Sequence, residues 1–170
     1  MFDELFPIED EILGKLNEVA KECYAAAVGD RDWTLEFKKA LRDLGESHGF
    51  QVWSSFGDKS SSEWLWDLCW ANCPEDKRGN LRAWENLRAI ELACEIEWKQ
   101  HDEWTLEDFL KLTVCNAAHR LFVFTAAATR LDDQFRRLMK ACPGSRGFRY
   151  LAVGVPNNPV ETLPYRAWTL

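Results

Sequence analysis

Two short, mostly apolar runs carry acidic residues at positions where a buried strand is normally apolar. The first covers residues 63–70 (Glu-Trp-Leu-Trp-Asp-Leu-Cys-Trp) and the second residues 91–99 (Glu-Leu-Ala-Cys-Glu-Ile-Glu-Trp-Lys). Their length and their aromatic and aliphatic content predict two buried β-strands. A buried carboxylate is costly unless it is paired, protonated or bound to a metal. The acids in these two runs therefore need partners, and this need constrains the fold.

The alternation of side chains along a strand predicts where these acids lie. Side chains alternate between the two faces with period two, so Asp67 shares a face with Leu65 and Cys69. In the second run, Glu95 and Glu97 share one face. If the two strands are neighbours with these faces aligned, two or three carboxylates converge, and such oxygen ligands are typical of Mg²⁺ sites. The opposite face of the first run would hold its large apolar side chains (Trp64, Trp66, Leu68 and Trp70).

Size and composition indicate one folded domain covering residues 1–170. The chain has 46% hydrophobic residues and nine Trp, which favours a globular fold over disorder. It has no apolar run of about 18 residues, so we expect no membrane span. The acidic N-terminus does not resemble a signal peptide, and we interpret the six Cys as reduced thiols of a cytoplasmic protein. The net charge of −7 counts against a broad nucleic-acid-binding surface.

The remaining pattern predicts the order of the other elements. Helices are expected at residues 8–27, 35–47, 105–118 and 129–141, with Thr34 and Thr105 as N-caps. Strands are expected at residues 51–56, 119–126 and 148–155, and the second acidic run is taken as a strand from about residue 90. Residues 161–170 are expected to cover an edge or an end of the sheet. This order predicts an α/β protein with a mixed central sheet of about five strands flanked by helices.

The element order, with Asp67 in the second strand and Glu95-Ile96-Glu97 in the third, resembles the restriction-endonuclease-like PD-(D/E)XK nuclease superfamily. The core of that family is a helix, three strands, a helix and a fourth strand (αβββαβ). The matching segment runs from about residue 35 to residue 123, and residues 107–112 (Glu-Asp-Phe-Leu-Lys-Leu) resemble a branch of small nuclease-like proteins. The resemblance implies a core at residues 34–125, an extra N-terminal helical extension at 1–30, and a C-terminal helix and strand at 126–170.

The resemblance also implies site residues. Asp67 matches the metal-binding Asp of the family, and Glu95 matches the first acid of the third-strand motif. The position that is usually Lys holds Glu97. Lys99 on the same strand and Lys111 on the next helix are the candidates to replace that Lys. We favour Lys111, because some members of the superfamily carry the Lys on this helix and Lys99 lies at or past the strand end.

A further acid, Glu46, matches the position where many members carry an additional metal ligand. The implied function is hydrolysis of phosphodiester bonds in DNA or RNA by a nuclease with one or two Mg²⁺ or Mn²⁺ ions, held by Asp67, Glu95 and Glu46. The alternative is a nuclease-like domain without catalysis that serves as a binding or regulatory module. A structural alternative for Asp67 is an ion pair with an arginine such as Arg120. Nucleic acid is the expected partner, and the sequence leaves a homo-oligomer open.

Overall fold

A computed structural model describes residues 2–54, 65–74, 87–99, 102–126, 130–142 and 147–170. The predicted turn at residues 57–61 lies outside this part of the chain. The elements follow in the order α1 (Pro7–Ala26), α2 (Asp30–Ser47), β1 (Gln51–Ser54), β2 (Leu68–Asn72), β3 (Ala89–Glu97), α3 (Asp102–Thr113), β4 (Ala117–Thr125), α4 (Leu131–Ala141), β5 (Arg149–Val155) and β6 (Tyr165–Thr169).

The six strands form one mixed sheet in sequence order, β1-β2-β3-β4-β5-β6. The pairs β3–β4 and β4–β5 are parallel, and the other three pairs are antiparallel. The predicted α/β class and mixed sheet are confirmed. The sheet has six strands instead of about five because the C-terminal tail forms β6 along β5. Among the described residues, no helix is long and apolar enough to span a membrane.

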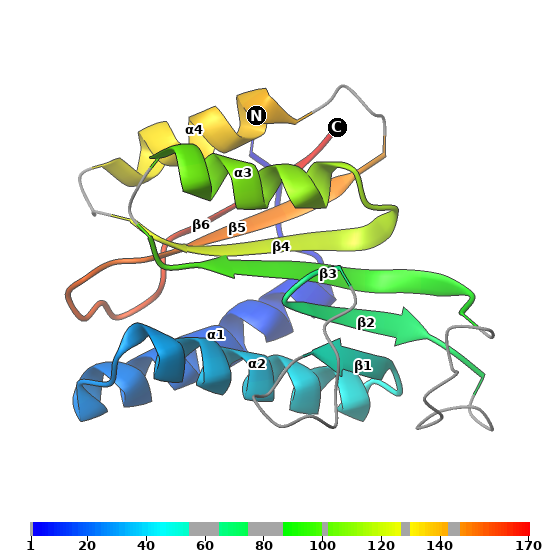
Figure 1. The fold of residues 1–170 in the computed structure, drawn as a ribbon, viewed down its shortest axis with the longest axis horizontal. Coiled ribbons are helices and arrows are strands. Elements are labelled where there is room, and N and C mark those ends of the chain that lie inside the picture. Colours follow the sequence, from blue (N-terminus) through cyan, green and yellow to red (C-terminus); the bar gives the residue numbers. More distant parts are fainter. Residues whose placement is uncertain (1, 55–64, 75–86, 100–101, 127–129, 143–146) are drawn as a thin grey trace.

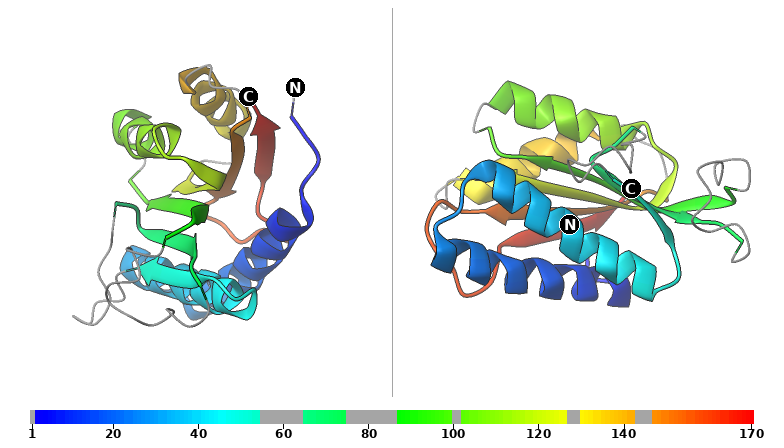
Figure 2. Two further views of the ribbon diagram at one scale, coloured as in Figure 1. Left: turned by 90° about the vertical axis from the view of Figure 1, so that its right-hand side faces the viewer. Right: turned by 60° about the horizontal axis from the view of Figure 1, so that its bottom comes forward.

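The helices cover both faces of this sheet. Figures 1 and 2 show α1 and α2 on one face and α3 and α4 on the other. One buried cluster joins Leu16 and Phe37 of the first pair to Trp70 of β2. The second cluster joins Phe109 and Phe135 of the other pair to the opposite face of the sheet. The two layers of helices therefore enclose the acidic strand β3 from both sides.

Both helices with predicted threonine caps begin earlier than expected. The N-cap of α2 is Gly29, and Thr34 lies inside the helix, where its hydroxyl donates to the carbonyl of Asp30 at 3.1 Å. Likewise α3 begins at Asp102, so Thr105 is helical, and its hydroxyl donates to the carbonyl of Lys99 at 3.2 Å. Acidic residues in a first turn favour a helix start electrostatically. Asp30 and Asp32 in the first turn favour the earlier start of α2 in this way.

The first acidic run is a bend followed by a strand. Residues 65–67 form the bend, and β2 begins only at Leu68. Leu68 and Trp70 pack toward α1 and α2, whereas Trp66 packs on the other face and its Nε1 donates to the carbonyl of Lys111 at 3.5 Å. The predicted grouping of Trp66 with Leu68 and Trp70 is therefore wrong, because alternation holds only within a continuous strand. Trp64 lies outside the described residues.

The N-terminal segment is fastened to the sheet by a buried ion pair. The Glu9 carboxylate at the start of α1 accepts hydrogen bonds from Arg149 Nε at 2.8 Å and from Arg149 Nη2 at 2.6 Å. His119 Nδ1 lies 3.1 Å from the same carboxylate, and the backbone N–H of Phe6 also donates to it. Burial alone would raise the pKa of Glu9, but the contacts with Arg149, His119 and Phe6 outweigh it and lower the pKa to about 2.

Candidate site where strands β2 and β3 separate

Asp67 occupies the point at which β2 and β3 stop pairing. The last paired residues are Leu68 of β2 and Cys94 of β3. Beyond them, Asp67 Oδ2 accepts the backbone N–H of Ile96 at 2.8 Å. The side chain thus replaces a main-chain acceptor that a longer β2 would have supplied. The predicted pairing of the two strands is confirmed, but Asp67 lies before β2 and not within it.

The second oxygen of Asp67 pairs with a lysine that we did not predict. Lys38 Nζ of α2 lies 3.0 Å from Asp67 Oδ1, and Lys38 is only 4% exposed. The helical pattern carried a signal for this residue, because Lys38 stands three residues before Leu41 on the buried stripe of α2. A Lys on such a stripe requires an anionic partner. The helix and the strand junction are therefore held together by charge.

Glu95 extends the cluster on the other face of the sheet. It is 4% exposed, and its Oε2 lies 3.7 Å from Lys111 Nζ of α3. Lys111 also pairs with Asp108, one turn earlier on α3. Partial burial would lower the pKa of Lys111, but the hydrogen bond with Asp108 and the charges of Glu95, Asp108 and Asp67 raise it. Three carboxylates therefore raise the pKa of the Lys111 ammonium group.

Glu97 shares a hydrogen bond with Asp108. Burial and this hydrogen bond raise the pKa of Glu97. Burial would also raise the pKa of Asp108, but the hydrogen bonds from Glu97 and Lys111 lower it. Of these two acids, Glu97 is therefore the one that holds a proton more tightly. Glu97 Oε1 also accepts the backbone N–H of Lys99 at 2.6 Å, and the Lys99 side chain is exposed beyond the strand end.

Asp67 and Glu95, which were expected to share one face of the sheet, lie on different sides of the strand junction. Glu95 and Glu97 share one face of β3, as predicted, and this face meets Lys111 and Asp108 of α3. Asp67 instead reaches the backbone of β3 and Lys38 of α2, because the bend before β2 turns it away from the expected face. The charges of Asp67 and Glu95 nevertheless both affect the thiol of Cys94. Burial, with the charges of Asp67 and Glu95, raises the pKa of the Cys94 thiol.

Two other residues from the sequence lie elsewhere. Glu46 is exposed near the end of α2, eight residues after Lys38, which is about 12 Å along a helix. The structure does not bring Glu46 to the cluster. Arg120, the proposed partner of Asp67, donates to the carbonyls of Leu112, Ala117 and Cys115 and so caps the end of α3. The Arg120 charge therefore interacts with the carboxyl end of α3 and not with Asp67.

The donor chemistry of the cluster suits a hard cation. In the part of the chain that the structure describes, no three His, Cys, Asp or Glu side chains are grouped so that they could hold a metal ion. Mg²⁺, however, is commonly held by one or two carboxylates, with water and substrate phosphates as its other ligands. Asp67 and Glu95 supply carboxylates of this kind, with Asp67 paired to Lys38 of α2 and Glu95 paired to Lys111 of α3.

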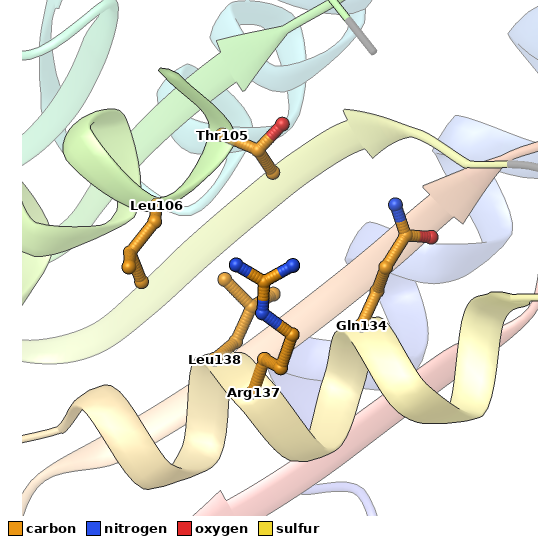
Figure 3. A pocket seen from close by; sticks show the side chains of 5 residues that line it. All are labelled: Thr105, Leu106, Gln134, Arg137 and Leu138. Atoms are coloured by element: carbon orange, nitrogen blue, oxygen red, sulfur yellow. The ribbon is translucent and has the colours of Figure 1, made fainter. Parts of the chain in front are cut away.

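A nearby pocket between α3 and α4 is too small for a substrate. It is lined by Thr105 and Leu106 of α3 and by Gln134, Arg137 and Leu138 of α4 (Figure 3). Its volume of about 10 Å³ corresponds to about one water molecule. The carboxylate–lysine cluster (Lys38, Asp67, Glu95, Glu97, Asp108 and Lys111) is therefore the candidate functional site.

The fold and the cluster define an α/β protein with an open six-stranded mixed sheet and an acid-rich site at one strand junction. No protein-family model, no curated protein and no solved structure matches the chain.

Proposed function

We propose that the chain is a metal-dependent nuclease that hydrolyses phosphodiester bonds in DNA or RNA. The observation that carries this proposal is the gathering of Asp67, Glu95 and Lys111 around the point where β2 and β3 separate. The order α2-β1-β2-β3-α3-β4 supports it, because it repeats the αβββαβ order of the PD-(D/E)XK nuclease core that the sequence resembles.

Each member of the cluster has a distinct role in this proposal. Asp67 and Glu95 are the residues that would hold Mg²⁺ or Mn²⁺, and such an ion would supply neutralisation of phosphate charge and a water of lowered pKa. Lys111, half-exposed and next to Glu95, stabilises negative charge that develops on the phosphate. Asp108 positions Lys111 through their ion pair. Lys38 offsets the charge of Asp67 from the buried side.

A second candidate function is a nuclease-like binding module without catalysis. Its support is that Asp67 pairs with Lys38 and Glu95 with Lys111, so both presumed metal ligands have cationic partners in the protein itself. Glu97 stands where the superfamily usually carries Lys, and it has a hydrogen bond with Asp108. The net charge of −7 also weakens general attraction to nucleic acid.

Metal-dependent stabilisation distinguishes a metal site from a cluster of internal ion pairs. A ligand that binds only the folded state raises the melting temperature. We expect Mn²⁺ and Mg²⁺ to stabilise the wild-type protein and the Glu46→Gln variant, but not Glu95→Gln. Glu46→Gln is the matched control, since it makes the same chemical change outside the cluster. Equal stabilisation of wild type and Glu95→Gln would place the metal at another site.

Cleavage assays then test catalysis. Single- and double-stranded DNA and RNA are incubated with each variant over a series of divalent metals. We expect cleavage by wild type and Glu46→Gln, loss of cleavage in Glu95→Gln, and reduced turnover with little change in substrate binding in Lys111→Met. Lys99→Met is the comparison for the strand-end lysine. Metal binding without cleavage of any substrate would favour the binding module.

A further inference from the structure

A second cavity lies at the carboxyl ends of parallel strands, on the α1–α2 face of the sheet. Thr125 and Val155, the last residues of β4 and β5, line it together with the connection between α1 and α2 and the segment after β5. Its volume is about 400 Å³, within the range of small-molecule sites. The carboxyl ends of strands in open α/β sheets are a common location for ligands.

Three aromatic residues form much of the wall of this cavity. The rings of Tyr24 and Trp33 have centroids 4.9 Å apart at 76°, and those of Trp33 and Trp98 are 5.8 Å apart at 56°. Rings at such steep angles form a corner of aromatic surfaces instead of one stack.

The polar ends of two of these rings are already used within the protein. The Tyr24 hydroxyl donates to the carbonyl of Pro156, and Trp98 Nε1 donates to Thr34 Oγ1 at 2.5 Å. These hydrogen bonds fix the positions of the rings. A ligand in the cavity therefore does not compete for these two polar groups and meets the aromatic rings themselves.

The charge of the cavity has one sign. Asp30, at the first position of α2, is the acidic residue among the described lining residues. Of the lining residues that the structure describes, none is Lys, Arg or His. An anionic group such as a phosphate would find no cationic side chain among them, and only the backbone at the start of α2 would attract it. The net charge of −7 further favours the approach of a cation.

We propose that this cavity binds an organic cation, such as a quaternary ammonium or a protonated amine with apolar substituents. Aromatic faces attract such cations through their quadrupoles, and the attraction strengthens when the cation is partly desolvated. Asp30 adds a carboxylate partner. Apolar lining residues such as Val28, Val155 and Pro156 suit methylene or methyl groups and disfavour a hydrated metal ion, which prefers oxygen ligands. The cavity shares no residue with the carboxylate–lysine cluster, so this proposal is independent of nuclease activity.

Choline and its neutral tert-butyl analogue, in which carbon replaces the quaternary nitrogen, test the proposal as a matched pair. Binding is measured by calorimetry and by the tryptophan fluorescence of the full chain. We expect choline to bind at least about tenfold more tightly than the neutral analogue, because only the cation gains from the π-faces and the carboxylate. Equal affinities, or no binding of either compound, would overturn the proposal.

Variants locate the binding. Asp30→Asn keeps the side-chain shape and removes the charge, and Trp98→Leu keeps an apolar wall and removes the indole. Both should weaken choline binding several-fold while the circular dichroism spectrum stays that of the wild type. Asp32→Asn is the matched control, since Asp32 is an exposed acid in the same helical turn that does not line the cavity. Choline affinity that is unchanged in Asp30→Asn, or a stronger response to adenosine than to choline, would overturn the assignment to a cation.

Discussion

Lys38 and Asp67 form an ion pair that joins helix α2 to the start of strand β2. Lys38 Nζ lies 3.0 Å from Asp67 Oδ1, with 5% of the Lys38 side chain and 22% of the Asp67 side chain exposed. The other oxygen of Asp67 accepts the backbone N–H of Ile96. Asp67 is therefore a structural link between α2, β2 and β3, in addition to its proposed role as a metal ligand.

This pairing predicts that Asp67→Asn destabilises the metal-free protein. The substitution removes the Asp67 charge from the buried Lys38 ammonium, and the expected loss is about 2–4 kcal/mol of unfolding free energy. Urea denaturation measures the loss. Asp43→Asn is the control, because it breaks an exposed pair with Arg42 and should cost less than about 1 kcal/mol. Wild-type stability of Asp67→Asn would show that the ion pair contributes nothing.

The double variant Lys38→Met/Asp67→Asn completes a thermodynamic cycle. Removing both charges avoids a buried ammonium that lacks the Asp67 charge, so the loss in the double variant should be smaller than the sum of the two single losses. Strict additivity would mean that the two side chains do not interact in solution.

The acidic strand could be predicted from sequence, but the environment of Asp67 could not. The alternation of Glu95 and Glu97 with apolar residues is local, and β3 follows it, so both acids face α3. Asp67 lies in a bend, where a local pattern no longer determines direction. Its partner Lys38 comes from an element 29 residues earlier, and only the packing of α2 on the sheet brings the two together.

The roles of Lys38 and Asp108 show the same limit. Lys38 stands on the buried stripe of α2, and a buried charge at such a position indicates an anionic partner on another element. Asp108 suits the first turn of a helix beginning at Thr105, but α3 begins at Asp102 and Asp108 lies in its middle, beside Glu97 and Lys111. A shift of one helical turn in the predicted start therefore concealed its role in the cluster.

Gly45→Ala should destabilise the contact between α2 and β2. An added Cβ would lie 2.5 Å from Nε1 of the buried Trp70, which donates to the carbonyl of Leu41 at 3.0 Å. The overpacking cost, about 1–3 kcal/mol, exceeds the helix-propensity gain of up to about 1 kcal/mol. Gly14→Ala in α1 is the control, because nothing lies within 4 Å of its added Cβ and the variant should be slightly more stable. Thermal melts that rank Gly45→Ala at or above wild type would contradict the close approach.

The Glu9–Arg149 pair predicts a loss of stability in acid. The pKa of Glu9 is lowered from 4.5 to about 2 in the folded protein, chiefly by Arg149 and His119 acting against burial. A lowered carboxyl pKa contributes stability that is complete above the unfolded-state value and is lost as the pH falls through the folded value. The contribution is on the order of 3 kcal/mol near neutral pH.

Denaturation of wild type, Glu9→Gln and Glu18→Gln between about pH 6 and pH 2 tests this linkage. We expect Glu9→Gln to be strongly destabilised near neutral pH and to approach wild type in acid. Glu18 forms an exposed pair with Lys15, so Glu18→Gln should follow the wild-type curve. A constant offset between Glu9→Gln and wild type at every pH would assign the effect to packing instead of ionisation.

Glu97→Gln should stabilise the protein as the pH rises. Burial and the hydrogen bond with Asp108 raise the pKa of Glu97, so its neutral form contributes stability that is lost as the pH rises through the folded value. A Gln amide can donate to Asp108 and accept the backbone N–H of Lys99, as the protonated carboxyl does, but it never ionises. The variant should therefore match wild type in acid and become more stable than wild type above the raised pKa. Unfolding free energies over this pH range measure the divergence, and Glu91→Gln on the same strand is the control. If Glu97→Gln instead loses stability relative to wild type as the pH rises, the folded protein favours the ionised form of Glu97.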